Sequence, residues 1–119
     1  MRMENARMIV LARSSPDMEA ELVRWLAESH LPDLLRVPGI TRAQLMELES
    51  LMDGSPVEYR TLAIYDLEGE DIHAIVREAG SRMGTAEMPR SAALGSPNLT
   101  FLGRPIVELR AELPEDVGQ

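Results

Sequence analysis

The sequence contains no cysteine and few aromatic residues. Without cysteine, the chain has no disulfide, no thiolate nucleophile and no cysteine-based metal site. Aromatic residues make up 3% of the 119 residues and hydrophobic residues 45%, so aliphatic side chains and the 8 methionines must build the core. Methionine fills irregular gaps in a core and also lines adaptable apolar pockets, and the sequence leaves both uses open.

Positive charge and long apolar runs are also lacking. Lys and Arg total 12 against 20 Asp and Glu, which gives a net charge of -8. Nucleic acids and anionic membrane surfaces bind basic proteins, so we expect neither as a partner. No stretch approaches the ~20 apolar residues of a membrane span, and the amino-terminal segment lacks a signal-peptide pattern. We therefore expect a soluble cytoplasmic protein, with which the missing cysteines are compatible.

The chain length fits one domain, which we expect over residues 1–111, followed by an acidic, frayed tail at residues 112–119. Hydrophobic patterning predicts four strands and two helices within this domain. The strands are expected at residues 6–12, 40–48, 58–67 and 99–109, and the helices at residues 18–35 and 72–83. Residues 45–52 also fit a helix, but the Pro-Gly turn before residue 40 and the turn-forming residues at 53–56 favour a strand over residues 40–48.

The first helix has a predicted start, interruption and end. Ser15 is expected to cap it, and Pro16 suits its first position. Pro32 lies inside the continuing helical pattern and predicts a kink or a pause near residues 30–31, after which the helix resumes as a short turn through residues 34–35. The Pro-Gly pair at residues 38–39 then ends the helix.

The apolar stripe of this helix contains an unusual polar residue. At 100° per residue, Trp25 and Ser29 fall in the middle of the stripe, and His30 falls at its edge. A small side chain such as Ser29 in a buried stripe leaves room for a cavity or for a close backbone contact.

Two features near the carboxyl terminus also bear on the architecture. Residues 85–98 have no clear periodicity and form a loop that is long for a compact domain, so this loop is a candidate binding loop or lid. Pro105 places the last strand at a sheet edge or at a bulge.

The predicted order β-α-β-β-α-β is that of the ferredoxin-like α+β fold, in which two helices cover one face of an antiparallel sheet. The second face of this sheet carries mixed rather than charged side chains, so we expect something to cover it. A second copy of the chain is the simplest cover, which predicts a homodimer through the sheet face.

Short motifs in the chain resemble those of a known superfamily. They are Trp25, the His-Leu-Pro step at residues 30–32, Val-Pro-Gly-Ile at residues 37–40 and Tyr-Asp-Leu-Glu at residues 65–68. With the order of elements, they make the chain similar to the dimeric α/β-barrel superfamily, and within it to the EthD-like group of small proteins. In that superfamily two protomers place their sheets face to face to form a barrel. Its members include cofactor-independent monooxygenases, polyketide cyclases, lactone isomerases, dehydratases and haem-handling enzymes, so the resemblance implies fold and dimer before chemistry.

His30 is the first candidate for catalysis, because histidine transfers protons near neutral pH. Beside the expected kink it can point into a cleft between helix and sheet, and the resemblance implies a pocket-facing histidine here. The structural alternative is a half-buried histidine that bonds a free carbonyl near Pro32 or stabilises the helix end. We expect His73 at the surface; the resemblance alone leaves haem ligation open for it.

Tyr65 is the second catalytic candidate, because its hydroxyl can donate to a substrate carbonyl or phenolate. The candidate substrate-binding residues are Trp25, Ser29, Arg42, Tyr59 and Met46. The structural alternatives are core packing for Trp25, interface packing for both tyrosines and a solvated strand edge for Arg42. No histidine or carboxylate pattern matches a metal site, and no nucleotide fingerprint is present, so we expect neither a metal nor a cofactor.

Two functions are consistent with these features. The first is a small enzyme that acts on a hydrophobic, aromatic or polyketide-like compound by cofactor-independent proton transfer, as a cyclase, isomerase or dehydratase, or that oxygenates it as a monooxygenase. In this enzyme His30 is the acid and base, and Tyr65 orients an oxygen. The second is a non-catalytic dimeric module that binds a small apolar ligand or accompanies an oxidase.

Overall fold

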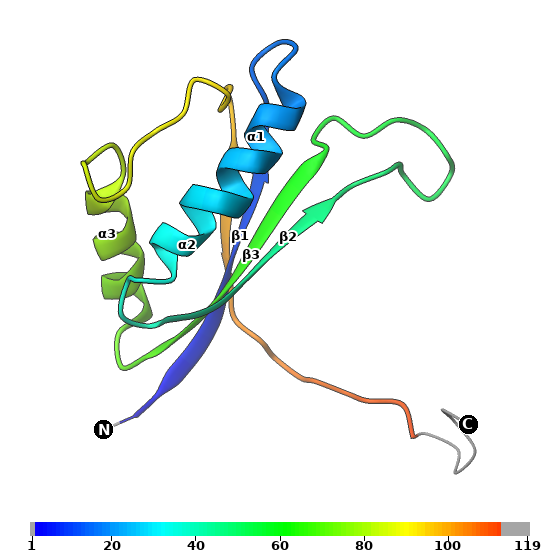
Figure 1. The fold of residues 1–119 in the computed structure, drawn as a ribbon. Helices are drawn as coiled ribbons and strands as arrows, with labels where there is room; N and C mark the ends of the chain where they lie inside the picture. The colour runs from blue at the N-terminus through cyan, green and yellow to red at the C-terminus, as the bar shows by residue number, and fades with distance from the viewer. Residues whose placement is uncertain (1, 113–119) are drawn as a thin grey trace, which may run out of the picture.

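Four strands form one antiparallel sheet in the order β2-β3-β1-β4 (Figure 1). They are β1 (Glu4–Ala12), β2 (Ile40–Glu47), β3 (Thr61–Gly69) and β4 (Leu99–Gly103). The structure is a computed structural model and describes residues 2–112. Helices follow β1 and β3, so the chain runs β-α-β-β-α-β and the predicted ferredoxin-like α+β class is confirmed.

Side-chain alternation gives the sheet one covered face and one open face. In β3 every second residue is buried beneath the helices: Thr61, Ala63, Tyr65 and Leu67. In β1 the buried side chains are Ala6, Met8 and Ala12. Figure 1 shows the helices gathered on this one face, and within residues 2–112 no helix covers the other. The core therefore lies between the helices and a single sheet face.

The first helical segment is continuous but changes its hydrogen-bond register. It consists of α1 (Glu19–Trp25), a π-helical turn η1 (Leu26–His30) and α2 (Leu31–Leu34). The prediction that Ser15 caps this helix is wrong, because the Ser15 hydroxyl donates to the carbonyl of Ala92 at 2.6 Å and its N–H donates to that of Ala93. The helix begins at Glu19 instead.

The interruption predicted near His30 is present as this π turn, and the backbone stays helical through His30 and Leu31. The Leu31 N–H donates to the carbonyl of Leu26, five residues back, so the π turn holds one residue more than an α-turn. That extra residue turns the following side chains by about 100°, the rotation of one residue. His30 thereby enters the buried stripe, and Ser29 leaves it.

The other elements match the predicted order, with some boundaries shifted. The helix α3 (Ile72–Arg82) begins at the Asp71 cap, whose carboxylate accepts from the N–H of Ala74 at 3.1 Å. The third strand begins at Thr61 rather than at residue 58. The edge strand β4 ends at Gly103, well before residue 109 and just before Pro105, which cannot donate to a ladder. The expected tail falls outside the described residues from 113 onward. Among residues 2–112 no helix has the length and apolar character needed to cross a bilayer.

Candidate functional site

A cavity of about 360 Å³ lies between the helices and the covered sheet face. Three strands form its floor, while the π turn, α3 and the loop at residues 85–98 form its walls. Its lining is mainly apolar, with a few polar side chains. The lining residues are Met8, Val10, Ala12, Trp25, Leu26, His30, Leu34, Ala63, Tyr65, Val76, Ala79, Gly80, Met83, Arg90, Leu94, Asn98 and Thr100.

His30 lines this cavity from the π turn and is 8% exposed. Its ring stacks on Trp25 with centroids 4.6 Å apart and an interplanar angle of 19°. Burial lowers the pKa of His30 below its ordinary value, and the Asp33 carboxylate opposes this shift only in part. The imidazole is therefore neutral at neutral pH, with one nitrogen free to accept a proton.

The Nδ1 atom of His30 has no hydrogen-bond partner within residues 2–112, although it is fully buried. A buried polar atom without a partner is rare in proteins and calls for an explanation. Stacking on Trp25, rather than a hydrogen bond, fixes the plane of this ring.

Tyr65 rises from the centre of β3 and is 1% exposed. Its cross-strand neighbours are Ala43 and Met8, and the small alanine leaves room beside the aromatic ring. Burial raises the pKa of the Tyr65 hydroxyl well above its ordinary value, so the group stays protonated. Tyr65 can therefore donate a hydrogen bond at every physiological pH.

The loop at residues 85–98 is held against the body at its middle and near its end, so it is not a free lid. Met88 and Ala93 are each 1% exposed and anchor its middle in the core. Near its end, the Asn98 side chain accepts from the N–H of Arg13 at 2.7 Å and donates to the carbonyl of Gly95. The loop therefore presents a fixed wall to the cavity.

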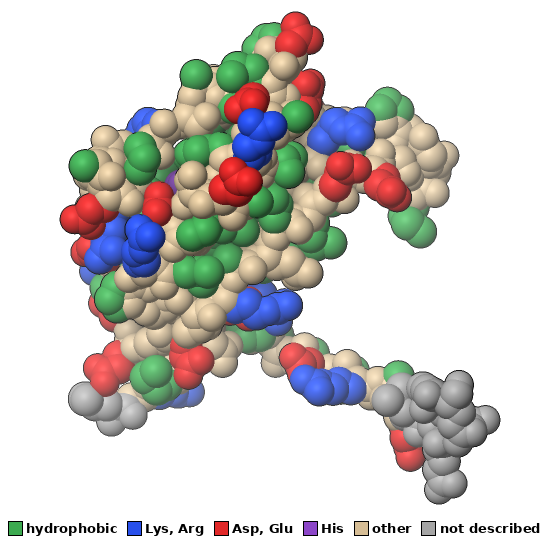
Figure 2. Space-filling model, in the orientation of Figure 1, with side chains coloured by type: hydrophobic (Ala, Val, Ile, Leu, Met, Phe, Trp, Pro, Cys, Tyr) green, Lys and Arg blue, Asp and Glu red, His purple; other side chains and the backbone are tan. Residues whose placement is uncertain are grey.

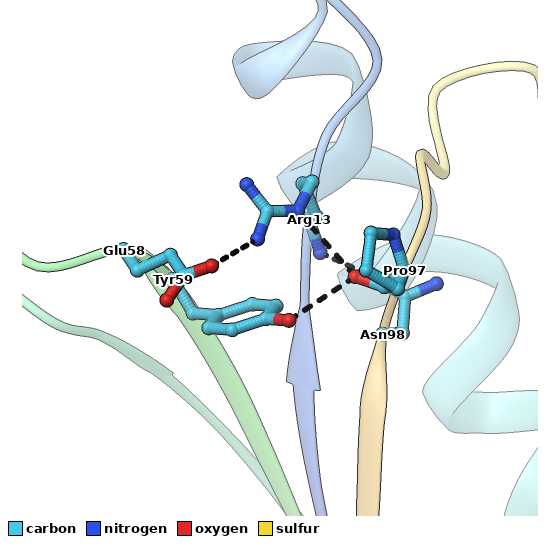
Figure 3. A network of polar contacts seen from close by, with 5 residues as sticks. All are labelled: Arg13, Glu58, Tyr59, Pro97 and Asn98. Carbon is cyan, nitrogen blue, oxygen red and sulfur yellow. Dashed lines mark hydrogen bonds and ion pairs between the residues drawn. The ribbon is translucent and has the colours of Figure 1, made fainter.

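Figure 3 shows the polar network behind this wall, in which Arg13 and Tyr59 meet the end of the loop. The Tyr59 hydroxyl donates to the carbonyl of Pro97 at 3.3 Å, and the Arg13 guanidinium lies 4.6 Å from the centre of the tyrosine ring. The guanidinium also contacts Glu58 at 2.7 Å. Tyr59 thus joins the start of β3 to the start of β4 and does not line the cavity.

The structure brings three of the predicted site residues together and places four elsewhere. His30, Tyr65 and Trp25 share the cavity, whereas Ser29, Arg42, Tyr59 and Met46 lie outside its lining. Ser29 faces a groove on the outer side of the helix. Arg42 and Met46 lie on the open sheet face, where Arg42 is 3.7 Å from the carboxylate of Asp66.

Several cavity residues were not predicted individually. They are Arg90, Leu94 and Asn98 from the loop, and Thr100 from β4. The absence of periodicity identified the loop as a candidate, but nothing in its sequence indicates which of its side chains turn inward. Within residues 2–112, no three His, Cys, Asp or Glu side chains lie close enough together to hold a metal ion.

Comparison with known proteins gives structural matches only. No family model and no curated protein sequence matches the chain. An ethyl tert-butyl ether D (EthD) family protein of Bacillus halodurans superposes with a TM-score of 0.61 at 14% identity, over 86% of this chain and 99% of that one. A dimeric ferredoxin-like protein of unknown function from Thermobifida fusca gives 0.50 at 20% identity, over 86% and 92%.

A monooxygenase from the ActVA-Orf6 gene of Streptomyces coelicolor, solved with nanaomycin D, gives a TM-score of 0.52 at 17% identity, over 92% of this chain and 94% of that one. The shared feature is the fold. At this level, the resemblance drawn from the sequence is confirmed, since both an EthD protein and a ferredoxin-like dimer are similar to the chain. Function has to be argued from the cavity itself.

Proposed function

We propose that the protein binds a small hydrophobic, aromatic or polyketide-like compound in this cavity and transforms it by proton transfer without a cofactor. The observation that carries the proposal is a neutral histidine and a protonated tyrosine on the walls of one apolar cavity. His30 supplies a neutral base, and Tyr65 supplies a hydroxyl donor that stays protonated at physiological pH. Trp25, Met8 and Met83 supply the apolar surface for the compound.

In the proposed step, a nitrogen of His30 accepts a proton from a carbon next to a carbonyl group of the substrate. The electron pair of that C–H bond moves to the carbonyl oxygen, which accepts a hydrogen bond from Tyr65. Return of the proton to another carbon gives isomerisation. Addition of the carbanion to a second carbonyl gives cyclisation, and departure of a neighbouring hydroxyl with the proton, as water, gives dehydration. With O₂ as co-reactant, the same carbanion is the species that a monooxygenase oxygenates.

Deuterium exchange tests this proposal without knowledge of the natural substrate. We expect the protein to accelerate exchange of the protons next to the carbonyl of 2-tetralone in D₂O, followed by NMR. His30→Gln should slow the exchange at least ~100-fold, the usual contribution of a general base. Tyr65→Phe should slow it roughly tenfold, since it removes one hydrogen bond to the developing oxyanion.

The matched control for the histidine is His73→Gln, which changes the exposed second histidine on α3 and should leave the exchange unchanged. Exchange that proceeds equally fast in the His30 and Tyr65 variants would show that the cavity does not perform this chemistry.

One observation favours the alternative, a non-catalytic binding module. Catalytic histidines are usually oriented by a hydrogen bond from the second ring nitrogen, and residues 2–112 supply no such partner to Nδ1 of His30. In a binding module, His30→Gln would retain affinity for aromatic compounds, and the wild-type protein would not catalyse exchange. The two measurements together separate the enzyme from the module.

We also propose that two copies pair through the open sheet face, in the cytoplasmic setting expected from the sequence. This face carries a continuous set of apolar side chains: Ile9, Leu11, Met46, Leu62, Ile64, Leu99 and Phe101. Arg7 and Arg42 flank Asp66 at one end of it, 3.5 and 3.7 Å from its carboxylate. An apolar face of this kind fits a second sheet. The similar ferredoxin-like protein of Thermobifida fusca is a dimer.

A further inference from the structure

The cavity differs in charge from the rest of the molecule. The chain has a net charge of -8, yet no aspartate or glutamate lines the cavity. The charged side chain in its lining is that of Arg90, since His30 is neutral. In an acidic protein, a cavity with one guanidinium and no carboxylate attracts anions rather than cations.

Arg90 is held at the cavity by its place in the loop. It lies between Met88 and Ala93, the two residues that anchor the loop in the core. Its side chain passes over Gly84, where a Cβ atom would lie only 3.0 Å from the Nε of Arg90. The backbone before and after Arg90 is therefore fixed. Because Gly84 has no side chain, the arginine side chain can lie against it.

Arg90 also lacks the ion pair that most other arginines form. Nine other arginines, on strands, helices and loops, lie within 4 Å of a carboxylate. Within residues 2–112, no carboxylate pairs with Arg90. A guanidinium offers five N–H donors in a planar fork that suits a carboxylate, so Arg90 at this apolar cavity can bind an anionic group of a ligand.

We infer that the cavity takes a ligand whose apolar body carries an anionic oxygen group, a carboxylate or a phenolate, and that Arg90 binds this group. The inference rests on the function proposed above and names the class of compound. Arg90 is a specificity residue in this arrangement: it holds the charged end of the ligand at the loop wall while the apolar body lies toward Trp25 and Met83. Because Arg90 is exposed at the rim of the cavity, we expect it to contribute about tenfold to affinity rather than more.

The test compares matched probes by isothermal titration calorimetry on the intact protein. The probes are 1-naphthoate, its neutral analogue 1-naphthamide, and 4-nitrophenol in its ionised and neutral forms. We expect wild-type protein to bind an anionic probe more tightly than its neutral counterpart, and added salt to weaken only the anion. Arg90→Gln should weaken the anion about tenfold and change the neutral probe less than twofold. Arg24→Gln, which removes the same charge from the outer surface of α1, should change neither.

The outcomes separate this inference from the proposed function. If Arg90→Gln weakens the binding of naphthoate alone, the anionic group is a carboxylate. If it weakens the binding of nitrophenolate alone, the group is a phenolate. If Arg90→Gln weakens charged and neutral probes equally, or weakens neither, the inference is wrong, while His30-dependent exchange of 2-tetralone would still support the cavity chemistry. If no probe binds the wild-type protein, the inference is wrong, and the exchange of 2-tetralone decides the proposed function separately. The thermal unfolding temperature of Arg90→Gln should match wild type, because the substitution breaks no ion pair among residues 2–112.

Discussion

His30 owes its properties to burial and stacking rather than to a hydrogen bond. The fold takes the ring out of water on the π turn, places it against Trp25 and leaves Nδ1 without a partner. Burial disfavours the charged form of the ring more than the neutral form, and this lowers the pKa of His30. The same arrangement that provides a neutral base therefore makes the folded state resist protonation.

This linkage gives a pH dependence of stability. Because the pKa of His30 is lower in the folded state than the value near 6.5 of the unfolded chain, the unfolded state binds more protons between the two values. The contribution of His30 to the free energy of unfolding is therefore complete above about pH 6.5 and is lost as the pH falls toward the lowered pKa. Urea unfolding of wild type and His30→Gln across this range should show a slope that the variant lacks.

The matched variant His73→Gln should keep that slope, since His73 is exposed and outside the cavity. An identical slope in wild type and His30→Gln would show that the ring is not buried in its neutral form.

At the residue scale, the sequence predicted the cavity in part. Trp25 was predicted from the helical stripe, and His30 and Tyr65 from the proton chemistry of their side chains. Periodicity alone placed His30 at the edge of the stripe, and the π turn brings it into the cavity. Arg90 was not predicted, because residues on an irregular loop have no period. Tyr59 was misplaced because its strand begins at Thr61, three residues later than expected, and its hydroxyl donates to the carbonyl of Pro97.

Among the elements, the π turn is the one that sequence reasoning did not find. Pro32 has no N–H to donate to the carbonyl four residues back. A helix accommodates this missing hydrogen bond by kinking or by widening one turn. A kink and a π turn both follow from the same missing N–H, so the local sequence does not predict which of the two forms. Packing favours the π turn here, because the wider turn places Leu26, His30 and Leu31 together on the buried side of the helix.

The turn between α2 and β2 offers a sharper test of packing at the element scale. Gly39 has φ +99°, and a Cβ atom there would collide with the side chain of Ile75 and lie 3.2 Å from the carbonyl oxygen of Glu68. Gly39→Ala should therefore cost about 1–2 kcal/mol for the left-handed backbone and about 1–3 kcal/mol more for overpacking. Chemical denaturation monitored by circular dichroism measures the loss.

Gly54 provides the matched control. It has φ +89° in the loop before β3, but nothing lies within 4 Å of its Cβ position. Gly54→Ala should therefore show only the backbone cost, about 1–2 kcal/mol. Equal losses in the two variants would mean that Ile75 moves aside freely and that the contact between α3 and this turn is loose.

At the scale of the whole molecule, the sequence predicts the topology of the sheet. The topology alone does not determine how two copies assemble. Alternating strands and amphipathic helices predict the order of the elements, and the structure confirms that order. The segment after β4, orange in Figure 1, leaves the body and exposes Ile106, Val107 and Leu109, and Figure 2 shows it projecting away from the sheet. The open sheet face and this segment are the apolar surfaces that a second copy can cover.

Two leucines of nearly equal exposure test that assembly. Leu99 is 42% exposed on the open face, opposite Leu11 in the register, and Leu35 is 43% exposed at the end of α2 on the helical side. Because a two-fold interface uses the same patch on both copies, Leu99→Glu places two unpaired carboxylates in it, and we expect it to weaken dimerisation more than tenfold. Leu35→Glu adds the same charge to the helical surface and should leave the dimer intact. Size-exclusion chromatography with light scattering over a dilution series measures both. A wild-type protein that is monomeric at every concentration, or two variants that dimerise equally well, would place the partner of the open face outside this chain.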